Sequence, residues 1–503
     1  MARKPNVLLL FNDHQAYYRH GWDGGVRPQR PHHERLAAEG VRFDRAYSPC
    51  PLCTPARRSL MTGLLAHNHG FLTLGIEPDE PPGESVYRRM AAAGYRLSYF
   101  GKWHTGPGIA ADEGCAGFSM PGYGNPYLAP EYKEYVRSRG LDEASFDVKY
   151  VVHEGDEERK PPLGPGYRCP WKNFTPHISG VLEQDDDAHE CNFVANLAID
   201  ELRRIAADEA RSPFFMSVHF WGPHMPYLAS QRFVDLYDPA TIQPYGSFED
   251  DLGGKPRVYR TEFNKPMSRD GRLVVPNPVP WDEWRTILRH CYAQISMVDD
   301  AGGRILDALA ELGLSDDTLV IWTTDHGDAL ASHGGHYDKN AYLTEEVLRV
   351  PMAMRLPGQI PAGRVSSDLV SLIDIPATIL DAAGTSFERP VDGASLLGLA
   401  SGQPARAWRQ DVMCETFGHH GERVVGRSLV TERYKYNAYR YLDADAVESE
   451  LYDLRDDPYE LRNLRSSANH TDVEADMIRR LRGWQERTRD VAPIAASLAC
   501  AES

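Results

Sequence analysis

Short apolar runs alternate along the chain with segments whose apolar residues recur every three to four positions. Four runs have the length and composition of buried strands, and they cover Val7–Phe11, Tyr95–Phe100, Phe214–Phe220 and Thr318–Thr324. Helical spacing is present in Asn192–Ile205, and again in a run formed by Ile295, Val298, Ile305, Leu309 and Leu312. Strands that alternate with helices are typical of an α/β domain.

Two long segments interrupt this alternation. Residues 105–190 are rich in Gly, Pro, Tyr and acidic residues and show little periodicity, and residues 238–281 are similar. Long segments without regular structure often carry function. We therefore expect the first to run over the sheet as a wall of the substrate site, and both to set specificity.

A change of pattern marks the end of the large unit. Residues 374–384 predict a helix with Gly384 as its stop signal. Beyond it, Leu429–Tyr441 and Glu450–Leu454 predict short strands, and Val473–Arg489 predicts an amphipathic helix. The expected division is a large α/β domain over 1–385 and a smaller α+β domain over 386–503.

Composition narrows the classes of partner. The 503 residues are 42% hydrophobic and 25% charged, with 55 Lys and Arg against 72 Asp and Glu, so the formal net charge is −17. This acidity argues against nucleic acid and anionic membranes as partners, and an anionic substrate would need a locally basic site. No apolar run is long enough for a membrane span, and the five residues of Val7–Phe11 are too few for a signal peptide core.

The eight cysteines are scattered. Cys50 and Cys53 have CxxC spacing but no second pair accompanies them, so a zinc knuckle is not expected. Without an export signal, we expect reduced thiols and a cytoplasmic location.

The densest chemical signal is the segment Pro51-Leu-Cys-Thr-Pro-Ala-Arg-Arg-Ser-Leu-Met-Thr-Gly63. Thr54 is predicted as the N-cap of a helix and Pro55 as its first residue. Cys53 would then lie at a helix N-terminus, where unpaired N–H groups and the dipole favour an anion. Arg57 on the first turn would reach the same anion.

Further polar residues follow the predicted strands. Asp13, Lys102, His224 and Asp325 each come after one of the four runs. Ligands of α/β sheets bind beyond the carboxyl ends of the strands, so these residues are expected to converge there. Lys102 and His104 are expected on an extended segment, where alternate residues point to one side. His219 lies inside a strand run and is predicted as a core histidine.

These segments resemble the sulfatase family of the alkaline phosphatase superfamily. Its signature C-x-P-x-R, followed by an apolar pair and Thr-Gly, matches 53–63 with Ala56 in place of the commoner Ser. Other matching segments, from 5 to about 464, are Pro5–His14, Gly101–His104, Pro223–Pro226, Asp325–Asp328, Tyr342–Pro351 and Glu450–Leu464. The resemblance implies an alkaline-phosphatase-like large domain with a central mixed sheet flanked by helices, plus a smaller C-terminal domain with a short antiparallel sheet.

The resemblance also implies residue roles. Cys53 would be converted to formylglycine, whose aldehyde hydrate supplies the nucleophile. One divalent metal would be bound by Asp13, Asp325, His326 and the group derived from Cys53. The family often has Asp or Gln where this chain has His14, so His14 and Asn12 are alternatives for the remaining ligand. Calcium is the family default, whereas His ligands favour Mn²⁺ over Ca²⁺ or Mg²⁺.

The remaining implied roles concern the sulfate group. Arg57, Lys102, His104 and Lys339 would bind the sulfuryl oxygens, and His224 would assist the leaving oxygen. Asp328, His333 and His336 are expected to be structural or to support the ligands.

The implied activity is hydrolysis of a small-molecule or sugar sulfate ester, with aryl, choline and carbohydrate sulfates all open. A formylglycine-generating maturation enzyme is the expected protein partner, and a homo-oligomer is left open. One alternative is a phosphonate monoester or phosphodiester hydrolase of the same superfamily, although that group tends to have Tyr and Thr at the positions of Lys102 and His104. The other is a non-catalytic binding protein, which the filled polar positions disfavour.

Overall fold

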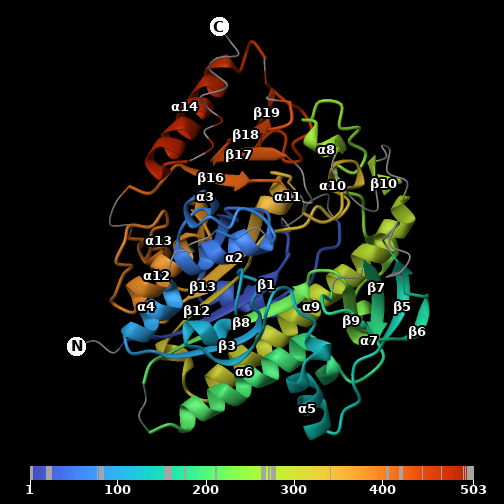
Figure 1. Cartoon of the computed structure of the whole chain (residues 1–503), viewed down its shortest axis with the longest axis vertical. Coiled ribbons are helices and arrows are strands. Elements are labelled where there is room, and N and C mark those ends of the chain that lie inside the picture. Colours follow the sequence, from blue (N-terminus) through green and yellow to red (C-terminus); the bar gives the residue numbers. More distant parts are fainter. Residues whose placement is uncertain are drawn as a thin grey trace.

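A nine-stranded mixed sheet forms the centre of the computed structural model (Figure 1). The structure describes residues 4–17, 25–75, 77–78, 84–151, 161–174, 177–209, 212–261, 268–269, 272–273, 279–339, 341–403, 407–418, 423–444, 446–465, 467–490, 492 and 494. The sheet has the order β14-β2-β13-β12-β1-β8-β3-β4, with β15 also paired to β2. The strands are β1 (Asn6–Asp13), β2 (Val41–Tyr47), β3 (Arg96–Lys102), β4 (Ala116–Met120), β8 (Phe214–Pro223), β12 (Thr318–Thr324), β13 (Arg349–Arg355), β14 (Arg364–Ser366) and β15 (Val370–Ser371).

The four predicted strands are the four central neighbours, and they run parallel. β1 pairs with β12 and β8, and β3 pairs with β8, all in parallel register. β13 is antiparallel to both β12 and β2, which makes the sheet mixed. The mixed sheet is therefore confirmed, and the carboxyl ends of β1, β3, β8 and β12 meet at one edge.

Helices cover both faces of this sheet because its central strands are apolar on both sides. In β1, Leu8 and Leu10 pack into one buried cluster with α6 (Glu190–Ala207) and α9 (Trp281–Glu311). Val7, Leu9 and Phe11 point the other way, into a cluster with the second set of helices. That set comprises α2 (Cys53–Thr62), α4 (Val86–Ala92) and α12 (Asp374–Ala382). Successive side chains of a strand alternate between faces, so one strand supports both layers.

Residues 105–190 contain more regular structure than predicted. β4 extends the central sheet, α5 (Pro130–Ser138) follows it, and three further strands of the segment form a separate four-stranded sheet with β9, in the order β6-β5-β7-β9. Those strands are β5 (Phe146–Val151), β6 (Gly164–Tyr167), β7 (Ile178–Leu182) and β9 (Tyr227–Ser230). They are short and rich in Gly and polar residues, which hides their alternation. Residues 152–160 and 175–176 of this segment lie outside the described residues.

The second segment, 238–281, is described only in part. α8 (Val258–Thr261) and the paired strands β10 (Ser268–Arg269) and β11 (Arg272–Leu273) lie in it. α9 begins at its end, at Trp281, well before the first residue of the predicted periodicity.

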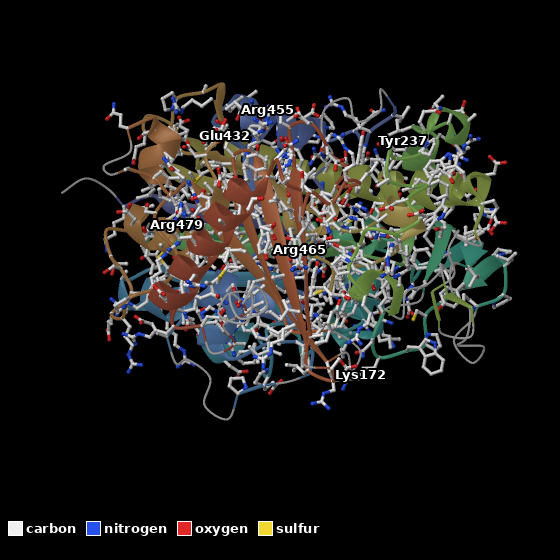
Figure 2. The ribbon with its side chains drawn as sticks, turned by 90° about the horizontal axis from the view of Figure 1, so that it is seen from above. Lys172, Tyr237, Glu432, Arg455, Arg465 and Arg479 are labelled. Atoms are coloured by element: carbon white, nitrogen blue, oxygen red, sulfur yellow. The ribbon has the colours of Figure 1, made fainter. Side chains whose placement is uncertain are left out.

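The C-terminal part is an antiparallel sheet with a helix, as expected. Its strands are β16 (Asp411–Thr416), β17 (Val424–Thr431), β18 (Tyr434–Tyr441) and β19 (Ala446–Asp453), followed by α14 (Thr471–Thr488). The predicted strand 429–441 is two strands, because a turn at Glu432 and Arg433 separates them. The sheet and α14 lie at one end of the molecule, where Arg465 and Arg479 are seen from above (Figures 1 and 2). The domain division at residue 385 stays a prediction.

The shorter helices connect these layers. They are α1 (Pro31–Ala38), α3 (Ala66–His69), α7 (Gln231–Val234), α10 (Ser332–Gly335), α11 (Glu345–Leu348) and α13 (Leu397–Ser401). Among the described residues, every helix is too short or too polar to span a membrane.

Candidate active site

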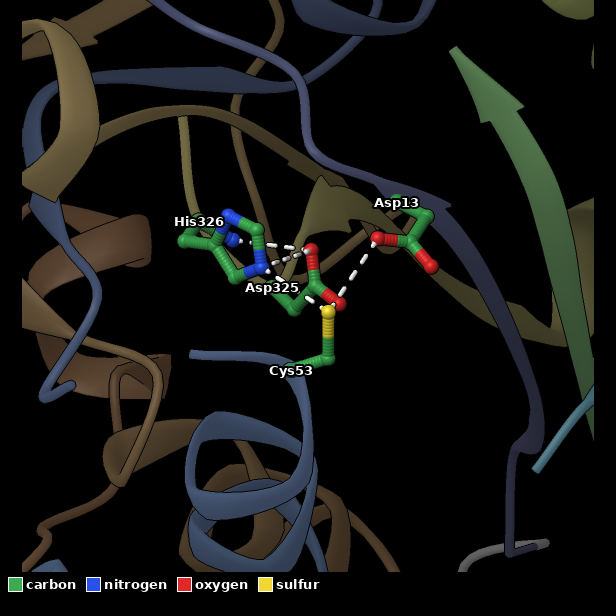
Figure 3. Close-up of side chains that lie close together, drawn as sticks. All are labelled: Asp13, Cys53, Asp325 and His326. Atoms are coloured by element: carbon green, nitrogen blue, oxygen red, sulfur yellow. Dashed lines mark hydrogen bonds and ion pairs between the residues drawn. The ribbon is translucent and has the colours of Figure 1, made fainter. Parts of the chain in front are cut away.

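Four potential ligands meet at the carboxyl edge of the central sheet (Figure 3). Asp13 ends β1, and Asp325 and His326 follow β12; the register pairs Asn12 with Thr324, which places the two aspartates side by side. Cys53 joins them from the start of α2. One donor atom from each of these residues lies within 4.8 Å of the others, and all four are buried.

The start of α2 differs by one step from the prediction. Leu52 is the N-cap, with extended backbone, and Cys53 is the first helical residue. Thr54 therefore lies inside the first turn, and no side chain of the described residues caps the helix. The first N–H groups of a helix have no partner within it, so this uncapped end suits an anionic group beside Cys53. Gly63 ends the helix in a left-handed conformation, as the Thr-Gly motif requires.

The tautomer of His326 is set by its backbone neighbour. Nδ1 lies 2.9 Å from the carbonyl oxygen of Gly327 and must donate to it. Nε2 is then the unprotonated nitrogen, and it lies 3.1 Å from Cys53 Sγ. A histidine that donates through one nitrogen and presents the other is the usual form of a metal ligand.

Asp325 is held as a carboxylate. Its Oδ1 accepts hydrogen bonds of 2.9 Å from the backbone N–H groups of His14 and His326. Burial alone would raise the pKa of Asp325, but His326 and Arg57 outweigh it and hold the pKa below its ordinary value. Two buried carboxylates and one neutral imidazole are a donor set that fits a divalent cation.

His14 and Asn12 lie beside this group without joining it. His14 has a left-handed backbone, and its Nε2 lies 3.5 Å from Asp328 and 3.3 Å from Asp338. Asn12 accepts a hydrogen bond from the Trp322 indole at 3.1 Å. The role of His14 as a ligand therefore stays a prediction, and Asn12 is tied to the core.

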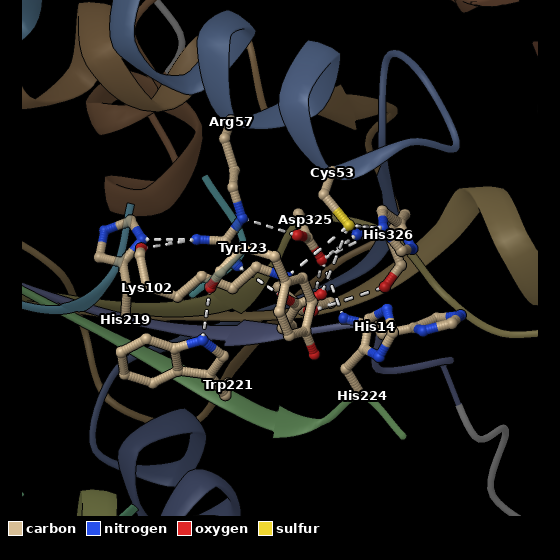
Figure 4. Close-up of polar contacts among 12 residues, drawn as sticks. His14, Cys53, Arg57, Lys102, Tyr123, His219, Trp221, His224, Asp325 and His326 are labelled. Carbon is tan, nitrogen blue, oxygen red and sulfur yellow. Dashed lines mark hydrogen bonds and ion pairs between the residues drawn. The ribbon is translucent and has the colours of Figure 1, made fainter. Parts of the chain in front are cut away.

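Two cations surround the carboxylates and Cys53 (Figure 4). Arg57 donates through Nε to Asp325 at 2.9 Å and lies 3.2 Å from Asp13. The ammonium of Lys102 contacts Asp13 and lies 3.9 Å from Cys53 Sγ. Burial and the nearby Asp13 raise the pKa of the Cys53 thiol to about 12, so the unmodified thiol is a weak nucleophile at neutral pH.

Lys102 and His104 are both at the site, but not on an extended segment. β3 ends at Lys102, and His104 has a φ of 44°. The left-handed backbone directs the ring against Tyr123, with ring centroids 5.6 Å apart. Burial and Lys102 hold the pKa of His104 well below its ordinary value. His104 is therefore a neutral ring in this pocket of charges.

The predicted pair His224 and Lys339 is brought together. His224 Nδ1 lies 2.8 Å from the carbonyl oxygen of Met225, and Nε2 lies 3.0 Å from Lys339 Nζ. Nδ1 must donate and Nε2 must accept, so the ring is neutral. Burial and Lys339 accordingly lower the pKa of His224. Lys339 also pairs with Asp338 at 3.1 Å.

Sequence reasoning missed the roles of two aromatic rings. His219, predicted as a core histidine, is buried but accepts from Arg57 at 3.1 Å and stacks on Tyr99. Tyr123 lies over Lys102, with Nζ 3.8 Å from the ring centroid, and its ring also contacts His224. No motif marks Tyr123, which comes from the segment predicted to wall the site.

The balance of charge suits an anionic substrate. Arg57, Lys102 and Lys339 are opposed by Asp13, Asp325 and Asp338. With a bound divalent cation, the site itself would have an excess of positive charge, although the net charge of the whole chain is −17. A positive electrostatic potential in a cleft attracts anions even when the protein as a whole is acidic.

The chain belongs to the sulfatase family: the model of that family matches residues 5–385. A second model, N-sulphoglucosamine sulphohydrolase, C-terminal, matches residues 332–487. The protein is a sulfuric ester hydrolase, and its family generally uses formylglycine and a divalent metal.

Three known proteins show how the likeness is distributed. The N-acetylglucosamine-6-O-sulfatase of Bacteroides thetaiotaomicron is 23% identical, with 98% of this chain and 88% of that protein aligned. The structure of BT4656 in complex with its substrate D-glucosamine-2-N,6-O-disulfate has a TM-score of 0.70 at 20% identity, covering 98% of this chain and 99% of that one. The phosphonate monoester hydrolase of Agrobacterium radiobacter has a TM-score of 0.75 at 22% identity, with 96% of each chain covered. These structures share the fold, which confirms the alkaline-phosphatase-like architecture.

Proposed function

We propose that the chain hydrolyses sulfate monoesters with a formylglycine formed from Cys53. The observation that supports this most is the position of Cys53 Sγ. It lies at the uncapped start of α2, within the group of Asp13, Asp325 and His326, and 3.9 Å from Lys102 Nζ. The Sγ atom marks where the hydroxyl oxygen of a formylglycine hydrate would stand. Such a hydrate supplies a nucleophilic hydroxyl and can release sulfate as the aldehyde re-forms, which a plain Ser or Cys cannot do.

The chain's own side chains divide the remaining work. Arg57, Lys102 and Lys339 neutralise the charge that develops on the sulfuryl oxygens. His104 lies beside Lys102 and completes that wall of the site. His224 would assist the leaving oxygen, and Lys339, whose Nζ lies 3.0 Å from His224 Nε2, can supply the proton to the ring.

We further propose one divalent ion, with calcium as the first choice. Asp13, Asp325 and His326 would hold it together with the oxygen derived from Cys53, and His14 is a further candidate. A bound cation polarises oxygen atoms and lowers the pKa of a coordinated hydroxyl. The imidazole of His326 keeps Mn²⁺ open as an alternative, and the two carboxylates keep Mg²⁺ open.

A sugar sulfate is the substrate that the comparisons favour. The N-acetylglucosamine sulfatase and the glucosamine disulfate complex are both similar over nearly the whole chain. We propose a sulfated amino sugar, with aryl and choline sulfates as the alternatives. A sulfate-release assay over sugar, aryl and alkyl sulfates decides among them.

The proposed compartment follows from the thiols. Among the described residues, five buried cysteines are free thiols: Cys50, Cys53, Cys115, Cys191 and Cys414. We propose a cytoplasmic enzyme that meets its formylglycine-generating partner there. Fractionation of the source cells tests this location.

The phosphonate monoester hydrolase neighbour supplies the second candidate activity, at a TM-score of 0.75. Lys102 and His104 favour sulfate, because they differ from the Tyr and Thr expected in that group. We expect a higher kcat/KM for an aryl sulfate than for the phosphonate monoester and phosphate diester of the same phenol. The Cys53→Ala variant is the control for background hydrolysis. A preference for the phosphonate would make the second candidate the function.

A further inference from the structure

Residues 328–339 form a closed turn, which we call the Lys339 turn, and it ends at the active site. Lys339 Nζ at its end lies 3.0 Å from His224 Nε2. Ala329 N donates to Asp338 O at 3.0 Å, which joins the two arms of the turn. The position of the Lys339 ammonium therefore depends on the conformation of this turn.

The turn adopts a conformation that its own sequence does not favour. Four non-glycine residues have positive φ angles: Leu330 (38°), Ala331 (71°), His333 (46°) and Asp338 (68°). Such left-handed conformations are uncommon for residues with a Cβ and persist only where the surroundings enforce them. Contacts outside the turn must therefore hold it.

Some of those contacts hold the arms of the turn, through Asp328 with Tyr227 and His336 with the Tyr259 carbonyl. The tip of the turn is held at His333. Its Nδ1 lies 3.4 Å from Asp250 Oδ2, and its Nε2 lies 3.3 Å from Glu346 Oε2. Gly334 N also donates to Ser247 O at 2.9 Å. His333 and Glu346 are buried, with 1% and 3% of their surfaces exposed. The tip is thus clamped between the loop after α7 and the start of α11.

The geometry of this clamp requires a charged histidine. Carboxylates are acceptors, so a ring nitrogen facing each of them must carry a proton. Burial and Lys255 oppose the charge, but Glu346 and Asp250 outweigh them, and the pKa of His333 is raised. The titratable groups packed around the ring are Asp250, Lys255, Tyr259, His336, Glu345, Glu346, Lys435 and Glu460.

We propose that His333 is a positioning residue: as an imidazolium between Asp250 and Glu346, it fixes the Lys339 turn and holds Lys339 against His224. This inference rests on the proposed role of Lys339 in binding the sulfuryl group. His333 itself touches neither Cys53 nor any of the three metal-binding candidates, among the contacts of the described residues.

A bound cation is the rival explanation of the same cluster. His333, Glu346 and Glu460 each offer an atom within 4.8 Å of the others. Lys435 already supplies positive charge there, because its Nζ lies 3.0 Å from Glu460 Oε1. The ammonium and the imidazolium together make a metal unnecessary, and metal analysis distinguishes the two readings.

A double-mutant cycle tests whether His333 acts through Lys339. We expect His333→Gln to lower kcat/KM for an aryl sulfate by about tenfold or more, since a displacement of about 1 Å can cost about 10²-fold. In a Lys339→Met background the same change should cost no more than about twofold, because the positioned group is gone. Equal losses in both backgrounds would overturn the proposal.

The pH profile provides a second readout. The ratio of wild-type to His333→Gln activity should fall as pH rises through the raised pKa of His333, because the wild type then loses the imidazolium. A ratio independent of pH would contradict the charged clamp. Asp250→Asn keeps the shape of the carboxylate and should reproduce the loss if His333→Gln folds poorly. His290→Gln is the control, because that buried histidine hydrogen-bonds to the Thr286 carbonyl within its own helix, α9.

Two further measurements separate this inference from the proposed function. Calorimetric binding of inorganic sulfate to the Cys53→Ala chain should weaken equally with His333→Gln and with Lys339→Met, and this needs no turnover. Unequal weakening would overturn the inference even if no sulfate ester is hydrolysed. A second metal ion per chain that is lost in His333→Gln would also overturn it, in favour of a cation cluster.

Discussion

Hydrogen-bond partners indicate a protonation state for three histidines around Cys53: His326, His224 and His219. His326 donates from Nδ1 to Gly327 and leaves Nε2 unprotonated, 3.1 Å from Cys53 Sγ, which suits a metal ligand. His224 donates from Nδ1 to Met225 and accepts at Nε2 from Lys339. His219 accepts from Arg57 and so supports its orientation. The three side chains are the same imidazole ring, and their different hydrogen-bond partners give each ring a different role.

Cys53 is the residue whose chemistry is most directly checked. Expression with a maturation enzyme should convert its CH₂SH group to an aldehyde, because the C-T-P-A-R context is intact. Mass spectrometry of the peptide should then show loss of sulfur and reaction with carbonyl reagents. Cys53→Ala should fold but lack turnover. Full activity from a wholly unmodified thiol would refute the proposed nucleophile.

His224→Ala should slow poor leaving groups most. An alkoxide needs a proton as it departs, whereas a nitrophenolate hardly does, and general acid assistance is worth about 10²–10⁴-fold. We expect much of that factor to be lost with an alkyl or sugar sulfate and far less with an activated aryl sulfate. A steeper dependence of kcat/KM on leaving-group pKa is the measurement.

The contrary outcomes for His224 are equally specific. Equal slowing of both substrate types would mean that the ring only binds sulfate. No slowing of either would make it a structural residue, held by Met225 and Lys339.

Most of these residues could be predicted because motifs mark them. Cys53, Arg57, Lys102 and His224 lie in short patterns that the chemistry restricts. Tyr123 and the role of His219 could not, since their contacts depend on distant strands and loops. The left-handed backbone of His104 also escaped prediction, because φ is fixed by the turn after β3 rather than by residue type.

At the level of elements, strand ends assemble the site. The four central strands were predictable because each is a compact apolar run, and their carboxyl ends placed Asp13 and Asp325 correctly. The sheet β6-β5-β7-β9 was not predictable from its short, glycine-rich strands. Its pairing of β7 with β9 depends on contact between residues almost 50 positions apart in register, such as Ser179 with Tyr227.

The proposed metal site takes its ligands from three elements, so loss of one ligand should empty it. Asp325→Asn removes a charged ligand at the end of β12, and we expect metal content and activity to fall together. Asp299→Asn is a matched control, because this buried carboxyl accepts from the backbone N–H groups of His32 and His33 outside the site. Elemental analysis after dialysis measures both. Full metal content in Asp325→Asn would show that the ligands lie elsewhere.

At the level of the whole molecule, a second charged histidine joins α3, the short helix that follows the Cys53 helix α2, to the C-terminal part. His67 in α3 donates to Glu415 in β16 at 2.8 Å and to the Thr488 carbonyl in α14 at 3.2 Å. Arg427 pairs with Asp490 nearby at 2.7 Å. Both ring nitrogens of His67 face acceptors, so each must carry a proton and the ring is a positively charged imidazolium.

This link predicts a pH dependence of stability. Burial opposes the charge on His67, but the hydrogen bond to Glu415 outweighs it and raises the pKa above its ordinary 6.5. The stabilisation is therefore fully present below about pH 6.5 and is lost as pH rises through the raised pKa. His67→Gln should lower Tm at about pH 6, and the difference from wild type should narrow toward about pH 9.

The measurement is the Tm of both proteins in thermal unfolding across this pH range. Tm is compared rather than a free energy of unfolding, because a chain of this size need not unfold in two states. His333 titrates in the same direction, so only the difference between the two proteins isolates His67. A difference in Tm that widens with pH would contradict a charged ring.

The burial of Cys53 sets an order of events in the life of the protein. Only 1% of this residue is exposed once the chain is folded, and α2, β1 and the segment after β12 enclose its side chain. A maturation enzyme that has to bind residues 53–57 cannot reach them in the folded protein. The proposed oxidation of Cys53 is therefore in competition with folding, and must be completed on the nascent or unfolded chain. A molecule that folds before this oxidation would stay inactive. The fraction of active enzyme would therefore depend on the relative rates of oxidation and folding rather than on the amount of protein made.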